Sequence, residues 1–199
     1  MQQGKFEGYK PYTFPNGDKY DGYWRNGLME GEGKYFFANG NKYIGNFQNG
    51  RYEGKGQLTW NSGNVYEGEF HNGTINGYGK KIYVDRNIYE GDWKNGLKHG
   101  KGIMSYYGGA KYEGDWKNDI RDGFGVYYWD SQNRYEGEFR NDNIEGNGKM
   151  FYDNGDVYDG SWYQNLRDGY CMYYHSNQGK WRKELYQKDN FVKALSDYQ

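Results

Sequence analysis

A repeat of 23 residues constrains the fold of this chain more than any other feature. The pentapeptide YEGDW occupies residues 89–93 and again residues 112–116. Steps of 23 residues from its first Tyr return a Tyr each time, with Gly two residues later and Trp or Phe four residues later. The tyrosines are Tyr20, Tyr43, Tyr66, Tyr89, Tyr112, Tyr135 and Tyr158. No insertion or deletion breaks this register, so the chain is an array of equivalent units.

Each unit reads as a β-hairpin. Turn signals occur twice per unit, as in Asn26-Gly27 and Asn39-Gly40, and Asn-Gly is a strong hairpin signal because both residues tolerate positive φ. The segment Tyr-x-Gly-x-Trp has a period of two, which places the Tyr, the Gly and the second ring on one face. We therefore predict an all-β fold, a single-layer twisted antiparallel meander of about seven to eight hairpin repeats, in which Gly leaves room for the rings.

Composition supports a folded chain with an aromatic core. Only 35% of the residues are hydrophobic, yet 21% are aromatic, with 25 Tyr, 10 Phe and 7 Trp. Disordered segments are poor in aromatic residues. Rings bury large areas each, so the core is predicted to consist mainly of them.

The pattern Y-x-G-x-W/F followed by G-x-G, with this period, resembles the MORN repeat (membrane occupation and recognition nexus) over residues 4 to about 186. The resemblance implies a half repeat or cap at 1–19, seven repeats at 20–180, and a degenerate eighth repeat at 181–199 that keeps an aromatic start but loses its Gly and second ring. In the tail, Phe191, Val192 and Leu195 have helical spacing and Asp189 precedes them as an N-cap. A short C-terminal helix that covers the last edge strand is therefore expected.

The sequence predicts no enzyme, no cofactor and no metal site. His71, His99 and His175 occupy different repeat positions, so the array does not gather them. Cys171 and His175 are about 13 Å apart along an extended strand, too far for a catalytic dyad. Carboxylates recur one position before the first repeat Gly of the second strand, without the spacing of a calcium loop, and are interpreted as a solvated face. They are Glu30, Glu53, Asp122, Glu145 and Asp168.

Two further columns predict a binding surface. A ring stands seventeen residues after most repeat tyrosines, and a variable, mostly large residue stands fifteen after them. These side chains either form the core of a curled sheet or stay partly open, because a single layer has nothing to cover them fully. Exposed Tyr, Trp and Met are typical of a protein-binding groove. The predicted partner-binding residues are Tyr35, Phe37, Leu58, Trp60, Tyr83, Met104, Tyr106, Tyr127, Trp129, Met150 and Tyr152.

Charge and family resemblance indicate the kind of partner. The net charge is -1, from 26 basic and 27 acidic residues that are interspersed, whereas nucleic acids and anionic membranes attract basic patches. The resemblance implies a scaffold or adaptor that binds an amphipathic helix or an extended peptide, in a radial-spoke-like, ciliary or cortical cytoskeletal assembly. Phospholipid binding is the alternative, and assembly through the ends of the array stays open. The single Cys and the lack of a long apolar run lead us to expect a cytoplasmic protein.

Overall fold

The computed structural model of the chain describes residues 6–129 and 132–196. The chain divides into two compact units, Met1–Lys98 (unit 1) and His99–Gln199 (unit 2), which are described separately. All regular secondary structure among the described residues is β-strand, in eighteen strands. No helix long and apolar enough to cross a membrane occurs in this part of the chain.

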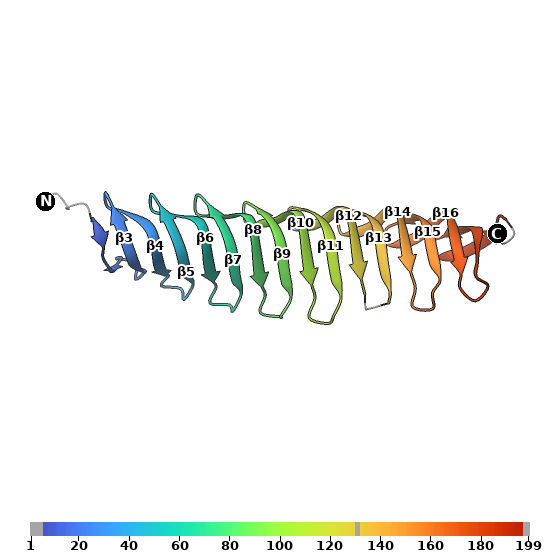
Figure 1. Cartoon of the computed structure of the whole chain (residues 1–199), viewed down its shortest axis with the longest axis horizontal. Coiled ribbons are helices and arrows are strands. Elements are labelled where there is room, and N and C mark those ends of the chain that lie inside the picture. The colour runs from blue at the N-terminus through green and yellow to red at the C-terminus, as the bar shows by residue number, and fades with distance from the viewer. Residues whose placement is uncertain (1–5, 130–131, 197–199) are drawn as a thin grey trace. The chain divides into compact units, whose positions relative to one another are not determined.

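Unit 1 is an antiparallel meander (Figure 1). Two short strands, β1 and β2, both pair with β3, and every later strand of the unit pairs with the one before it. The strands are β1 (Gly8–Tyr9), β2 (Tyr12–Thr13), β3 (Lys19–Arg25), β4 (Leu28–Phe36), β5 (Lys42–Gln48), β6 (Arg51–Thr59), β7 (Val65–His71), β8 (Thr74–Ile82) and β9 (Ile88–Lys94).

Unit 2 has the same organisation. Each of its strands, from β10 to β18, pairs antiparallel with the next. They are β10 (Leu97–Ser105), β11 (Lys111–Lys117), β12 (Ile120–Tyr128), β13 (Arg134–Arg140), β14 (Asn143–Phe151), β15 (Val157–Tyr163), β16 (Leu166–His175), β17 (Lys180–Gln187) and β18 (Asn190–Ala194). The all-β antiparallel prediction is therefore confirmed.

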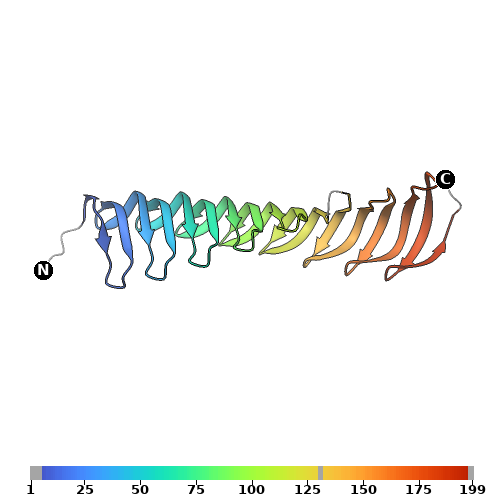
Figure 2. The same cartoon turned by 90° about the horizontal axis from the view of Figure 1, so that it is seen from below.

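The turn chemistry explains these hairpins. In the tight turn of each repeat hairpin, both turn residues have positive φ, as at Asn26 (54°) and Gly27 (81°) or at Asn141 (48°) and Asp142 (66°). This conformation matches the right-handed twist of the flanking strands. Figure 2 shows such tight turns alternating with longer connections along each unit.

The repeat tyrosines form the floor of the core. All seven are at most 1% exposed, and each hydroxyl donates to the carbonyl three residues on, as from Tyr112 to Asp115 at 3.0 Å. A Cβ added to Gly114 or Gly125 would lie 2.6 or 2.5 Å from the Tyr112 hydroxyl oxygen. The predicted fit of a ring on glycine backbone is therefore present, and it leaves no space for a methyl group.

Hydrogen bonds between turns hold neighbouring hairpins together. The Glu53 carboxylate accepts the backbone N–H of Asn72 at 2.9 Å, and Glu30 accepts that of Asn49 at 3.0 Å. On the other edge of unit 1, the Asn41 side chain accepts the N–H of Asn61 at 3.0 Å. The acidic column, interpreted from the sequence as a solvated face, thus connects one hairpin to the next.

The expected C-terminal helix is wrong. Residues 180–194 instead form β17 and β18, joined by a two-residue turn in which Lys188 and Asp189 have φ of 47° and 64°. The Asp189 carboxylate accepts the N–H of Arg167 at 2.8 Å rather than capping a helix. A helix of this length is marginal on its own, whereas the strand gains the hydrogen bonds of the preceding sheet edge.

The eighth repeat also differs from its predicted register. Tyr186 lies opposite Gly169, just as Trp162 lies opposite Gly146 in the preceding repeat. Tyr186 is therefore the second ring, which was predicted to be lost, and it stands 24 rather than 23 residues after Trp162. The additional residue lies before β17, and it shifts Trp181 away from the position of a repeat Tyr.

Candidate functional site

Four of the predicted binding residues meet in one groove of unit 2. Tyr127, Trp129, Met150 and Tyr152 line a groove of about 530 Å³, together with two arginines, Arg121 and Arg167. We call this site the aromatic groove. Phe139, Ile144 and Trp162, all at most 8% exposed, line it from the core side.

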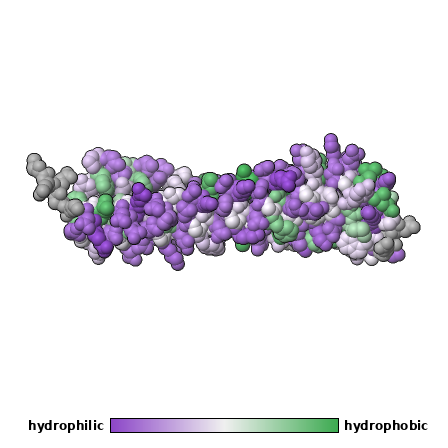
Figure 3. Space-filling model, turned by 90° about the horizontal axis from the view of Figure 1, so that it is seen from above, coloured by the Kyte–Doolittle hydropathy of each residue, from purple (hydrophilic) through white to green (hydrophobic). Residues whose placement is uncertain are grey.

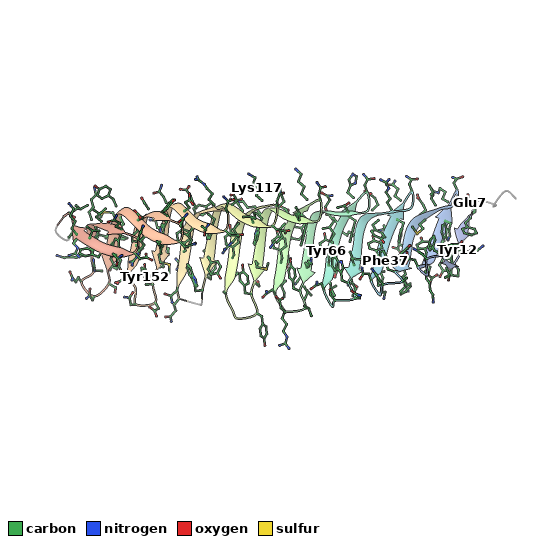
Figure 4. All side chains as sticks on the ribbon, turned by 180° about the vertical axis from the view of Figure 1, so that it is seen from behind. Glu7, Tyr12, Phe37, Tyr66, Lys117 and Tyr152 are labelled. Atoms are coloured by element: carbon green, nitrogen blue, oxygen red, sulfur yellow. The ribbon has the colours of Figure 1, made fainter. Side chains whose placement is uncertain are left out.

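Strand register places the rings along this groove. Tyr127 of β12 lies opposite Tyr135, and Met150 of β14 lies opposite Tyr135 on one side and Tyr158 on the other. Trp129 and Tyr152 follow directly where these strands end. Figure 4 shows Tyr152 near the edge of unit 2 that carries the longer turns, with Lys117 at the opposite edge.

A row of rings is interrupted at Met150. Ring centroids are 6.2 Å apart for Tyr106 and Tyr127, 4.8 Å for Tyr127 and Trp129, and 6.4 Å for Tyr152 and Tyr173. Met150 occupies the repeat position that Tyr127 and Tyr173 hold in the two neighbouring repeats. A thioether therefore takes the repeat position at which the neighbouring repeats have a ring, and it lines the groove together with Trp129 and Tyr152. We call this interruption of the row of rings the slot.

The groove offers apolar surface together with hydrogen-bond donors. Trp129 is 42% exposed, and Tyr127, Met150 and Tyr152 are half-buried. Burial raises the pKa of the Tyr152 hydroxyl, so this group stays protonated at neutral pH and can donate. Met104, also predicted to bind a partner, is only 7% exposed and belongs to the core.

Two arginines of the groove were missed by sequence reasoning. The Arg121 side chain donates from Nε to the Asp142 carboxylate at 3.0 Å and from Nη2 to the Asp142 carbonyl at 2.8 Å. Its guanidinium lies 5.5 Å from the Tyr127 ring centroid. Arg167 pairs with Asp189 in the same way at 3.0 Å, so each cation of the groove has an adjacent carboxylate.

The variability of one repeat position explains why these arginines were missed. The position nine residues after the repeat Tyr holds Met, Tyr, Ile, Lys, Arg, Ile and Arg, which shows no pattern. Counting alternate residues back from Tyr127 through Gly125 places Arg121 on the ring face. The strand register agrees, because Arg121 lies opposite Trp116. Strand alternation could therefore have located both arginines.

In unit 1 the predicted binding residues make contacts among themselves. The Tyr35 hydroxyl donates to Asp18 at 2.6 Å, and its ring centroid lies 4.8 Å from that of Phe37. Lys81 Nζ lies 4.8 Å from the ring centroid of Trp60 and 4.9 Å from that of Tyr83. Leu58, half-buried, lies opposite the core residue Tyr66. The predicted binding surface of unit 1 is thus partly occupied by contacts among its own side chains.

A second groove in unit 1, of about 1010 Å³, lies on the face opposite the buried tyrosines. Its lining mixes apolar surface with carboxylates and ammonium groups, which include Glu32, Lys34, Lys55, Glu67 and Lys80. Figure 3 shows one face of the molecule, where hydrophilic residues predominate and hydrophobic residues form small separate areas.

Most groups that could perform chemistry are engaged in local contacts or buried, and His99 has a buried Nδ1 without a hydrogen-bond partner. Burial raises the pKa of the Cys171 thiol to about 12, so it carries little thiolate at neutral pH. His71 Nδ1 lies 2.8 Å from Glu53, and His175 Nε2 lies 2.8 Å from Glu184. Among the residues that the structure describes, no group of three or more His, Cys, Asp or Glu could hold a metal ion.

Comparison with solved structures found distant similarities. The TCP domain of SAS-4 (dCPAP) from Drosophila melanogaster, solved in complex with a proline-rich motif of Ana2, is 14% identical; the match covers 90% of each chain with a TM-score of 0.48. The TCP10 domain of Danio rerio CPAP, solved with a peptide of STIL, is 13% identical; the match covers 97% of each chain with a TM-score of 0.40. Comparison with curated proteins found no match.

The family comparison is specific. The MORN repeat matches seven consecutive segments, at residues 20–42, 43–65, 66–88, 89–111, 112–134, 135–157 and 158–180. These segments begin at the seven repeat tyrosines, and together they cover most of the chain. The chain therefore belongs to the MORN-repeat family.

Proposed function

We propose that this protein is a non-catalytic scaffold that binds a segment of a partner protein in the aromatic groove. The observation that carries this proposal is the groove itself, about 530 Å³ in volume, with Trp129 42% exposed beside Tyr127, Met150 and Tyr152. Aromatic residues, Met and Arg are enriched at protein interfaces, and Trp, Tyr and Arg dominate binding energy there. Repeat arrays commonly bind partners along such extended surfaces.

The electrostatics of the groove favour a peptide over an anionic lipid surface. Arg121 and Arg167 are each paired with an aspartate, Asp142 and Asp189, at 3.0 Å. These pairs offset the positive charge that an anionic membrane would attract. They still present polar groups beside apolar rings, which suits an amphipathic helix or an extended segment.

The cellular setting is proposed on the family resemblance alone. We place the scaffold in the cytoplasm, in a cytoskeletal assembly at the cell cortex or in a cilium. The test is imaging of the fluorescently tagged chain, beside a Trp129→Ala chain, in ciliated cells. Enrichment on the axoneme or cortex that depends on Trp129 is expected. A diffuse distribution of the wild type would contradict this setting without affecting the groove.

Selection from an unbiased peptide library tests the binding function. Displayed random peptides are enriched on the wild-type protein and then measured against Trp129→Ala. The matched control is Tyr170→Ala, since Tyr170 is 61% exposed and lies three residues from the ring-face residue Tyr173, on the other face of β16. We expect at least tenfold weaker binding for Trp129→Ala, as for a hot-spot residue, and no change for the control, with circular dichroism showing that both are folded.

Two results would count against the scaffold. Enriched peptides that bind Trp129→Ala as well as the wild type would show that the aromatic groove is not the site. Failure to enrich any peptide, together with binding of the wild type to phosphatidylserine vesicles, would favour the lipid alternative.

A further inference from the structure

We propose that the occupant of the aromatic groove is a proline-rich segment in the polyproline II conformation, with a proline at every third position. This inference rests on the proposed function and specifies its partner. It follows from the spacing of the rings, the slot at Met150 and the donors that line the groove.

The spacing of equivalent rings matches polyproline II. Trp129 and Tyr152 are one repeat apart, which is two strands, or about 9.6 Å at the usual strand separation. Three residues of polyproline II advance about 9.3 Å and return to the same face. Over two repeats the two periods differ by only about 0.6 Å, on the same figures.

Other backbone conformations fit this spacing less well. An α-helix advances about 10.8 Å in two turns, so its side chains drift by more than about 2 Å over two repeats. An extended strand presents side chains to one face about every 6.6 Å, which does not coincide with consecutive rings. The periodicity of the groove therefore selects among the partners that its apolar surface alone would accept.

The slot has the chemistry for a proline ring. Trp129, Met150 and Tyr152 all line the groove, so two rings and a thioether are available to contact it. Grooves lined by aromatic side chains recognise polyproline II segments by contacting their proline rings. A flexible Met side chain adapts its shape to the ligand. Tyr127 and Tyr173, at the equivalent positions of neighbouring units, show that the fold accepts a ring where Met150 stands.

The donors of the groove complement a polyproline II backbone. Its carbonyls have no internal hydrogen bonds and seek external donors, whereas those of an α-helix are already occupied. Three residues of its lining carry groups that can donate, namely the indole N–H of Trp129 and the hydroxyls of Tyr127 and Tyr152. A helix would leave these donors without a backbone partner.

The test uses four labelled twelve-residue peptides, three of which have identical composition. One carries proline at every third position, the second has the prolines rearranged without that period, and the third is the all-D form of the first. A fourth peptide is an amphipathic helix of the same length. Fluorescence anisotropy with the full chain is expected to show at least tenfold tighter binding of the first peptide than of the other three.

Two substitutions locate the binding. Met150→Tyr fills the slot with the residue that neighbouring units carry, and Trp129→Ala removes its exposed side. Each substitution is expected to weaken binding of the peptide with proline at every third position at least tenfold. Tyr170→Ala, on the opposite face, is expected to leave this affinity unchanged. Circular dichroism of Met150→Tyr checks that the fold is retained.

The outcomes separate this inference from the proposed function. Equal binding of the rearranged or helical peptide, or unchanged binding to Met150→Tyr and Trp129→Ala, would overturn it. If the unbiased library returns groove-dependent peptides without periodic proline, the scaffold stands and this inference fails. If it returns no groove-dependent peptide, both fail.

Discussion

At the scale of single residues, the fold depends on the contact of each repeat tyrosine with the backbone of two residues, mostly glycines, on neighbouring strands. Tyr112 lies over Gly114 and Gly125, which face each other across β11 and β12, and its hydroxyl donates to Asp115. The hydroxyl is needed because an unpaired buried carbonyl is costly. Gly114 and Gly125 leave room for the ring, because a Cβ on either would lie 2.6 or 2.5 Å from the Tyr112 hydroxyl oxygen.

The substitution Gly114→Ala tests this arrangement. Its Cβ would lie 2.5 Å from the Cα of Gly125 and 2.7 Å from the Phe124 carbonyl oxygen. Backbone atoms cannot move aside cheaply, so we expect unfolding free energy to fall by about 1–3 kcal/mol. Gly108→Ala is the control, because its Cβ would meet nothing within 4 Å. Equal losses in denaturant titrations of both variants would contradict the explanation.

At the scale of elements, the β17–β18 hairpin ends the array with an unusual replacement. Glu184 lies opposite Cys171, where other units have Gly opposite Gly, and it is only 1% exposed. Arg182 donates to its carboxylate from Nη2 at 2.6 Å, and the Tyr186 hydroxyl donates to it at 3.1 Å. A buried charge requires such partners, so a polar cluster replaces the ring-on-glycine contact here.

Removal of one partner should loosen this hairpin. We expect Arg182→Ala to cost about 3–5 kcal/mol, since it leaves the Glu184 carboxylate buried without its guanidinium. Hydrogen exchange of the β17 and β18 amides should accelerate.

The comparison for this prediction is Arg140→Ala, which breaks an exposed ion pair to Glu145 at 3.1 Å. Its expected cost is at most about 1 kcal/mol. The double variant Arg182→Ala with Glu184→Gln should recover part of the loss. If it does not, the electrostatic explanation is wrong.

At the scale of the whole molecule, buried repeat tyrosines with a raised pKa make folding sensitive to alkaline pH. Burial raises the pKa of the Tyr20 hydroxyl to about 12 and that of Tyr43 and Tyr135 further still. The folded state thus holds the proton more tightly than the unfolded state, in which tyrosine ionises near its ordinary value of about 10. The contribution of these tyrosines to stability is therefore fully present below about pH 10, and it is lost as the pH rises toward the folded pKa.

We expect a cooperative alkaline transition above about pH 10, because each buried tyrosine adds about 1.4 kcal/mol of destabilisation per pH unit. Tyrosinate absorbance and circular dichroism should change together. Tyr163→Phe, at a residue 54% exposed, should leave the midpoint unchanged. Gradual ionisation of the tyrosines without loss of structure would show that the rings are less protected than their burial indicates.

The sequence by itself determined the repeating unit of this protein. The 23-residue period, the Asn-Gly turns and the alternation of ring and glycine were sufficient for the hairpins, because strand alternation and turn conformation are local properties of the chain. The same alternation predicted the positions of Tyr127, Trp129, Met150 and Tyr152, which meet in the aromatic groove.

Only the tertiary structure decided which other side chains join them. Strand alternation places Arg121 and Arg167 on the ring face, opposite Trp116 and Trp162, but only the packing of neighbouring hairpins pairs each arginine with an aspartate in the groove. Glu53 binds the next turn, and Asp189 binds Arg167 instead of starting a helix. These contacts join residues about 20 positions apart. Tertiary context of this kind overrides the local helix signal of the tail.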